Sequence, residues 1–198
     1  FDDTLMMALL YFKKMNPDYV ILETGIGGRM DSTSGIYQVP EVSVITRIGL
    51  DHTALLGDSI PEIASEKAGI IKRGTTLVLG ENVPEATSVI KKEAVESEVP
   101  IVFSEKTSID NYELSLKGTY QKENMRNAVS VIRTLMDRDR ELWNKKCMES
   151  GSEADGDICL TDRDNGTDAS KHSLEDYTEN AIKCGLKNVN WPGRMQYL

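Results

Sequence analysis

The sequence has few cysteines, few aromatic residues and no excess of basic charge. Its three cysteines (Cys147, Cys159 and Cys184) are widely spaced and form no Cys-x-x-Cys pair, which indicates a reduced, cytoplasmic protein. The formal net charge of -9 argues against a general nucleic-acid binder, because such a protein needs basic surface to neutralise phosphate. No apolar run approaches the length of a transmembrane helix, and the first residues lack the pattern of a signal peptide.

The composition is that of a globular protein, with 39% hydrophobic and 28% charged residues among 198. This length suffices for one full-sized domain, or for one domain and part of another. The chain has no initiator methionine, begins within a helical pattern and ends on MQYL, which resembles the start of a strand. We therefore expect it to be a piece of a longer protein.

Short apolar runs alternate with helical patterns along most of the chain. This alternation, with short connections, predicts an α/β fold with a largely parallel sheet flanked by helices. Residues 149–171 are acidic, rich in Gly, Ser and Asp and poor in aliphatic residues, which predicts a mobile surface insertion. The predicted strands cover residues 19–25, 42–49, 76–80, 100–104 and 112–116, and the predicted helices cover 3–15, 59 to Gly69 or Gly74, 84–98, 121–137 and 174–184.

The segment ETGIGGRMD, residues 23–31, follows the first predicted strand. Its three glycines allow a tight loop with exposed amides, and Arg29 could reach an anion. Glu23 stands at the carboxyl end of a predicted parallel strand, the edge where open α/β sheets bind ligands. The segment nevertheless matches neither the dinucleotide fingerprint nor a phosphate loop with its Gly-Lys-Ser/Thr.

Asp51 and His52 follow the second predicted strand, so they share an edge with Glu23 if the two strands are neighbours. A carboxylate and an imidazole that converge there are compatible with Mg²⁺ or Mn²⁺, although nitrogen ligands are unusual for Mg²⁺. Taken singly, each has a more ordinary interpretation. A glutamate at a strand end is usually a solvated or capping carboxylate, and a histidine after a strand is usually a hydrogen-bonding loop residue.

Lys67 lies on the helix that begins shortly after His52, so it could project toward the same edge. A buried lysine at a site is a cation, or a modified amine, with a role there. The alternative is a surface lysine that pairs with Glu66 or Glu62, and the pattern alone favours this alternative.

Four blocks of sequence together are highly specific: ETGIGGRMDSTS, SVITRIGLDHTALLGDSIPEIASEKAGIIKRG, LKGTYQKENMRNA and WPGRMQ. In order and spacing they resemble the folylpolyglutamate synthase / dihydrofolate synthase family of the Mur ligase superfamily. The resemblance covers most of residues 1–136 and resumes at about residue 173.

The resemblance implies an ATP-dependent amide ligase with the P-loop NTPase-like fold of a Mur ligase central domain. ATP phosphorylates a folate or dihydropteroate carboxylate, and L-glutamate then displaces the phosphate, with Mg²⁺ as the metal. Residues 1–190 would be the central domain, incomplete at its N-terminus and interrupted at 149–171, and residues 191–198 would begin the C-terminal ligase domain. The family's phosphate loop is absent, so this piece alone is expected to be inactive. The resemblance also implies a monomer, while the net charge of -9 and the lack of a long apolar run predict no nucleic-acid or membrane partner.

The resemblance assigns roles to particular residues. Glu23 and His52 are similar to ligands of a Mg²⁺ near the γ-phosphate. Lys67 is similar to the family's carbamylated lysine, an anion that helps to hold a second metal. Asn124 matches an asparagine that contacts the nucleotide, and Arg194 matches an arginine that reaches an ATP phosphate.

Three further positions complete the comparison with the family pattern. Asp51 is expected to orient His52 or its loop. Tyr120 stands where the family often has histidine, and Ser34 replaces the usual asparagine. Two alternatives stay open: another Mur-type amino-acid ligase, and a non-catalytic nucleotide-binding relative.

Overall fold

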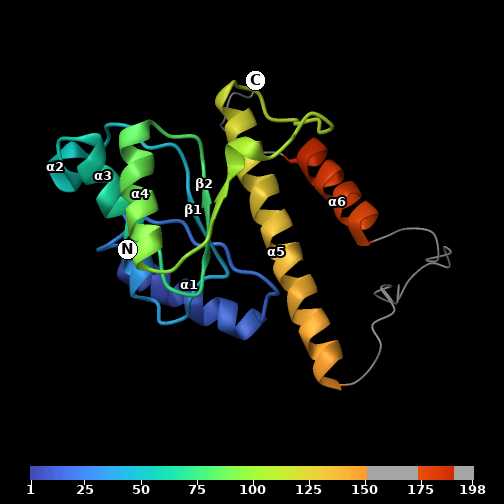
Figure 1. The fold of residues 1–198 in the computed structure, drawn as a ribbon. Coiled ribbons are helices and arrows are strands. Elements are labelled where there is room, and N and C mark those ends of the chain that lie inside the picture. Colours follow the sequence, from blue (N-terminus) through green and yellow to red (C-terminus); the bar gives the residue numbers. More distant parts are fainter. Residues whose placement is uncertain (151–173, 190–198) are drawn as a thin grey trace. The chain divides into compact units, whose positions relative to one another are not determined.

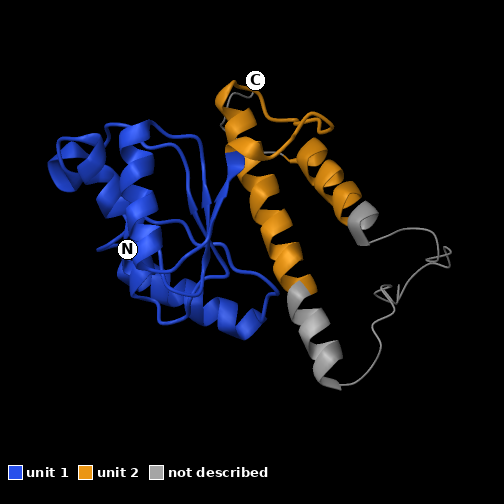
Figure 2. Cartoon of the chain, viewed as in Figure 1, with its two compact units in different colours: residues 1–104 blue, residues 105–198 orange. Residues whose placement is uncertain are grey.

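The structure is a computed structural model that describes residues 1–150 and 174–189. The chain divides into two compact units, residues 1–104 and 105–198, which Figure 2 distinguishes by colour. Across these described ranges, no helix has both the length and the apolar character needed to cross a membrane.

The first unit has a three-stranded parallel sheet in the order β1-β2-β3. Val42 pairs with Thr76 and Ile45 with Leu79, so the carboxyl ends of β1 and β2 lie at the same edge. Helices α3 and α4 lie side by side along the sheet (Figure 1). These findings confirm the predicted α/β class. The elements are α1 (Asp2–Met15), η1 (Ser32–Gly35), β1 (Val42–Ile45), α2 (Thr53–Leu56), α3 (Ile60–Ala68), β2 (Thr76–Leu79), α4 (Pro84–Glu96) and β3 (Ile101–Phe103), followed by η2 (Ser104–Lys106).

The core of the first unit surrounds the central strand β2. Leu77, Val78 and Leu79 are at most 1% exposed, as expected for a strand with a neighbour on each side and helices against it. The helices contribute small and β-branched residues at helical spacing, so that α3 and α4 can pack closely. The buried cluster consists of Ile45, Ile48, Leu56, Ile63, Ala64, Ala68, Ile71, Leu77, Leu79, Ala86, Ile90, Ala94 and Val99.

Helix α3 begins with the capping box that its sequence predicts. Glu62 Oε2 accepts hydrogen bonds from the backbone N–H of Asp58 (2.9 Å) and of Ser59 (3.0 Å). The Ser59 hydroxyl also donates to this carboxylate, and these bonds lower the pKa of Glu62. Gly69 ends the helix, which was one of the two ends expected.

Two of the predicted strands are wrong. Residues 19–25 have no strand structure, and Ile21 is 94% exposed. A short apolar run becomes a strand only when a neighbouring strand takes its backbone groups, and the described sheet starts at β1. Residues 112–116 also form no strand. The Ser115 N–H instead donates to the carbonyl of Leu186 on α6 (3.2 Å).

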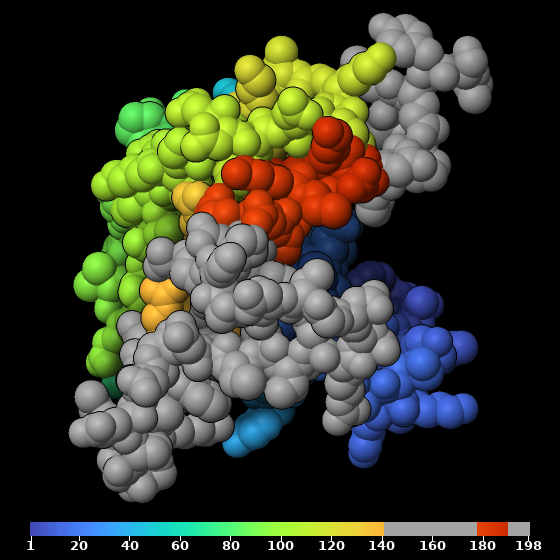
Figure 3. Space-filling view, turned by 90° about the vertical axis from the view of Figure 1, so that its right-hand side faces the viewer, coloured from blue at the N-terminus to red at the C-terminus, as the bar shows by residue number. Residues whose placement is uncertain are grey.

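The second unit contains α5 (Tyr120–Ser150) and α6 (Leu174–Asn188), both longer than predicted. Figure 3 shows the outer face of α6, in red, with the segment that precedes α5 beside it. Arg133 on α5 donates to Glu179 Oε1 on α6 (2.9 Å) and to the Tyr112 hydroxyl (3.0 Å). The Tyr112 hydroxyl and Arg133 lower the pKa of Glu179 by bonding to its carboxylate. The proposed insertion at 149–171 lies almost entirely outside the described residues.

Candidate active site at the carboxyl edge of the sheet

His52 lies in the segment that leaves β1 at the carboxyl edge, immediately before α2. Its backbone is in the left-handed region (φ 51°, ψ 36°), a conformation in which histidine is enriched but which still costs of order 1 kcal/mol. Asp51 Oδ1 accepts the His52 backbone N–H at 2.8 Å, and Asp51 Oδ2 lies 3.7 Å from His52 Nε2. Asp51 therefore bonds to the backbone of His52 and lies near its imidazole at a separation longer than a hydrogen bond. Its role in orienting His52 stays a prediction.

The glycine loop is closed by its own aspartate. Asp31 Oδ2 accepts the backbone N–H groups of Gly25 (2.8 Å) and Ile26 (3.2 Å), while Oδ1 accepts that of Thr33 (3.0 Å). Burial raises the pKa of Asp31, but the bonds from Thr33, Ile26 and Gly25 outweigh it and lower the pKa. The acid at the exit of the loop therefore has a structural role.

The loop packs against both helices that follow β1. A Cβ on Gly27, which has φ +71°, would lie 2.8 Å from the Leu56 side chain on α2. A Cβ on Gly28 would lie 2.7 Å from the carbonyl oxygen of Lys67, at the end of α3. The two glycines therefore permit a close backbone approach, and they bring the segment after Glu23 against the helices that follow His52 and carry Lys67.

The end of α3 is fixed to the loop at Arg29. The Arg29 N–H donates to the Glu66 carbonyl (2.9 Å), and a Cβ on Gly69 would lie 2.4 Å from Arg29 Cα. The Arg29 guanidinium donates to the Ser65 carbonyl (3.2 Å) and pairs with Glu66 (3.9 Å) and Glu93 (3.5 Å). The sequence suggested that Arg29 could reach a bound anion. In the structure its guanidinium instead holds the loop to α3 and α4.

Replacement of Gly69 with alanine should loosen this junction, because the new methyl group would meet backbone atoms that cannot rotate away. We expect a loss of about 2 kcal/mol, or a Tm lowered by about 4–8 °C, in calorimetry of the complete gene product. Gly35 is the matched control, since a Cβ there would meet nothing within 4 Å. Equal Tm values for the two alanine variants would contradict the close packing of the loop.

Glu23 is exposed and Lys67 is half-buried. Within residues 1–150 and 174–189, neither side chain makes a hydrogen bond or ion pair. The alternative of a lysine paired with Glu66 or Glu62 is wrong, because Glu66 pairs with Arg29 and Glu62 is held in the capping box. No group of three His, Cys, Asp or Glu side chains in the described part could hold a metal, so these side chains alone do not form a metal site there.

The two remaining predicted contacts lie elsewhere in the chain. Asn124 lies at the surface near the start of α5, in the second unit, and its Nδ2 donates to Gln121 Oε1 (3.0 Å). Tyr120, at the first position of the same helix, is partly exposed. Arg194 lies outside the described residues.

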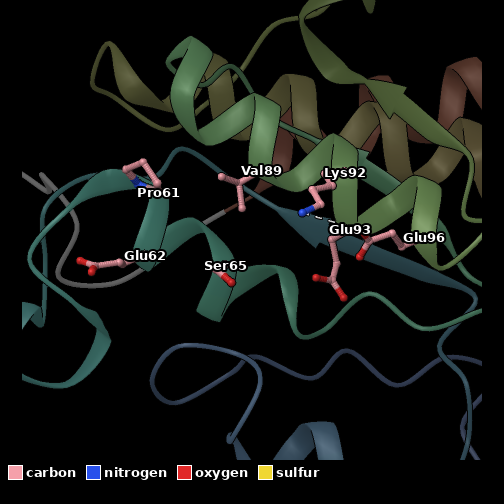
Figure 4. Close-up of a pocket in the computed structure, with 7 residues that line it drawn as sticks. All are labelled: Pro61, Glu62, Ser65, Val89, Lys92, Glu93 and Glu96. Carbon is pink, nitrogen blue, oxygen red and sulfur yellow. Dashed lines mark ion pairs between the residues drawn. The ribbon is translucent and has the colours of Figure 1, made fainter.

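A shallow groove of about 340 Å³ lies between α3 and α4 and is distinct from the predicted site residues (Figure 4). Its acidic residues already have partners: Glu62 caps α3, Glu93 pairs with Arg29 and Glu96 pairs with Lys92. The groove is therefore assigned no ligand. It is lined by Pro61, Glu62, Ser65, Val89, Lys92, Glu93 and Glu96.

Asn82 lies at this edge and was not predicted from the sequence. Its Oδ1 accepts the N–H of Ile48 (2.7 Å), and its Nδ2 donates to the carbonyls of Thr46 (3.1 Å) and Gly80 (3.0 Å). The available signal was an asparagine three residues after a buried strand, which is a common loop residue and therefore a weak indication.

Comparison with known proteins identifies the chain, although no family model matches it. It is 35% identical over 192 residues to a probable folylpolyglutamate synthase of Schizosaccharomyces pombe, covering 96% of this chain and 32% of that protein. It is 34% identical over 212 residues to the dihydrofolate synthase/folylpolyglutamate synthase of Bacillus subtilis, covering 96% and 41%. The chain therefore spans 32% and 41% of the length of these two relatives.

Solved structures agree with the sequence matches. A folylpolyglutamate synthase in complex with AMPPCP and folate superposes with a TM-score of 0.65 and 28% identity, over 94% of this chain and 42% of that one. The folylpolyglutamate synthase of Thermotoga maritima gives a TM-score of 0.66 and 25% identity, over 98% and 40%. The fold is thus that of the Mur ligases. Within that class, the chain belongs to the folylpolyglutamate synthase / dihydrofolate synthase family.

Proposed function

We propose that the complete protein is an ATP-dependent ligase that joins L-glutamate to a carboxylate of folate or dihydropteroate. The observation that carries the proposal is the packing of the glycine loop after Glu23 onto α2 and the end of α3. The packing joins the loop that follows Glu23 to the two helices that follow His52 and carry Lys67. The segment with His52 leaves β1 at its carboxyl end, the edge where open α/β sheets bind ligands. The names of the relatives, and the ligands of one related structure, supply the substrate class.

The proposed chemistry has two steps. The substrate carboxylate attacks the γ-phosphate of ATP to give an acyl phosphate and ADP, and the glutamate amine then attacks the acyl carbon and expels phosphate. Bound Mg²⁺ would neutralise charge on the phosphoryl oxygens. Glu23 and His52 would hold this ion. Lys67 would contribute a carbamate oxygen toward a second ion.

The donor chemistry of the described residues is compatible with this assignment. The Glu23 carboxylate is an exposed hard oxygen donor without a protein partner in the described part of the chain. Asp51 bonds to the His52 backbone N–H and lies 3.7 Å from the imidazole Nε2, so it would orient the ring, the usual role of a carboxylate behind a ligating imidazole. The partly buried Lys67 has no carboxylate partner in those residues, so conversion to a carbamate would break no ion pair.

The proposal extends to the rest of the chain. Asn124 and Arg194 would contact the nucleotide, residues 1–190 would form the central domain, and residues 191–198 would begin the next one. We further propose a cytoplasmic monomer that acts on small molecules without a nucleic-acid or membrane partner. The net charge of -9 supports the exclusion of nucleic acid.

The test is ADP formation by the complete gene product. We expect ADP only when folate or dihydropteroate, L-glutamate and Mg²⁺ are all present. If folate does not change the rate of ADP formation but a peptidoglycan precursor raises it, the proposal is overturned in favour of another Mur-type ligase. No ADP formation with any carboxylate would favour a non-catalytic relative.

A further inference from the structure

Asn82 connects the carboxyl ends of two neighbouring strands with a single side chain. β1 ends at Ile45 and β2 at Leu79, which are partners in the register, and Asn82 lies three residues beyond Leu79. Its amide bonds to Thr46 and Ile48, the residues that leave β1, and to Gly80, which leaves β2. The three bonds use both the carbonyl and the amino group of the side chain, so neither an acid nor an aliphatic residue can reproduce them.

The segment that contains His52 is held at both of its ends. At one end the Ile48 N–H is bound by Asn82 and the Ile48 side chain is 4% exposed in the core. At the other end Leu56 is 7% exposed and packs against Gly27. Between these anchors, Leu50, Asp51 and His52 are exposed, and His52 has the left-handed backbone conformation. An exposed residue keeps such a conformation only when the surrounding structure determines it.

We propose that Asn82 is a positioning residue that holds the backbone from Thr46 to Ile48 and thereby fixes His52 for metal binding. The inference rests on the proposed role of His52 as a metal ligand. Asn82 itself would touch neither metal nor substrate. Its loss would allow the segment to move while the buried strands β1 and β2 stay paired.

The test compares N82A and N82D with wild type in the complete gene product. The first variant loses all three bonds, whereas the second keeps an acceptor for the Ile48 N–H but cannot donate to the two carbonyls. The matched control is N188A, because Asn188 also donates from its amide to a backbone carbonyl, that of Cys184 on α6 (2.9 Å), but belongs to the second unit.

Two readouts separate positioning from a general loss of structure. For N82A we expect amide hydrogen exchange in residues 46–52 to quicken at least tenfold, while exchange in β2 and α4 stays unchanged. We also expect Mn²⁺ binding, followed by electron paramagnetic resonance, to weaken about tenfold, and kcat to fall about tenfold with KM for folate within twofold. The exchange rate of the Ile48 amide in N82D should lie between the rates in N82A and wild type. N188A should match wild type in exchange, Mn²⁺ affinity and kcat.

Two outcomes would decide against the inference. Unchanged Mn²⁺ affinity in N82A and N82D would overturn it, even if exchange in residues 46–52 increases. Unfolding of both variants would overturn it as well, because Asn82 would then support the whole unit. If wild type binds Mn²⁺ but forms no ADP with folate, the ligase proposal fails. The exchange and Mn²⁺-binding data would still test whether Asn82 positions His52.

Discussion

Replacement of Glu23 with glutamine, or of His52 with alanine, is expected to lower the turnover of the complete protein by about 10²–10³-fold. Each change removes a donor from charge stabilisation of the phosphoryl transfer, a loss of about 3–4 kcal/mol in the activation barrier. Both side chains are exposed, so their removal creates no cavity and should leave Tm within about 2 °C of wild type. The measurement is steady-state ADP formation with saturating substrates over a series of Mg²⁺ concentrations.

Glu85 provides the matched control for Glu23. It is an exposed glutamate in the first turn of α4, remote in sequence from every proposed ligand, so Glu85→Gln should keep activity within twofold of wild type. A deficit in the Glu23 and His52 variants that extra Mg²⁺ partly corrects would support metal binding. Near-normal turnover in both variants would remove the metal-ligand assignment.

Replacement of Lys67 with alanine is expected to lower turnover about 10²-fold, with partial recovery when a short carboxylate such as acetate is added. A carbamate is a carboxylate analogue, so a small acid that enters the space left by the side chain can return the lost oxygen donor. The second part of the prediction concerns wild type. Its activity should fall in bicarbonate-free buffer and return when bicarbonate is restored, since a carbamate forms reversibly from the amine and carbon dioxide.

Lys92→Ala is the control for this experiment. Lys92 is an exposed lysine on α4 that pairs with Glu96 at 3.9 Å, so its loss should change neither activity nor the response to acetate. Full activity of wild type in bicarbonate-free buffer, together with no rescue of Lys67→Ala, would contradict the carbamate. Turnover would then depend on the amine itself or on another feature of α3.

The parallel sheet and its helices were predictable because their signals are local. β2 is a short apolar run between two loops, and the Ser59–Glu62 spacing predicts the start of α3. The run at residues 19–22 has the same apolar character, yet it forms no strand, because strand formation depends on a neighbour and not on composition alone. Residues 112–116 show the same dependence, since their partner is helix α6.

The candidate site was predictable to a different degree for each residue. Glu23, His52 and Lys67 stand in distinctive motifs, and the loop after Glu23 packs on the helices that follow His52 and carry Lys67. Their roles at a metal stay predictions. The role of Arg29 was not predictable, because its partner Glu93 is 64 positions away and no local pattern links the two. Asn82 was missed for the same reason: its bonds reach residues 34 and 36 positions earlier. Side-chain bonds across a fold become visible only when the fold is known.

Oxygen transfer from the substrate carboxylate to phosphate tests the central claim most directly. Folate labelled with ¹⁸O in its side-chain carboxylates is incubated with the complete protein, ATP, Mg²⁺ and L-glutamate, and both products are analysed by mass spectrometry. An acyl phosphate requires that one labelled oxygen appear in each phosphate released, and that the folate product gain one glutamate and lose one labelled oxygen. Unlabelled phosphate, or ADP formed without any gain of glutamate, would contradict the account.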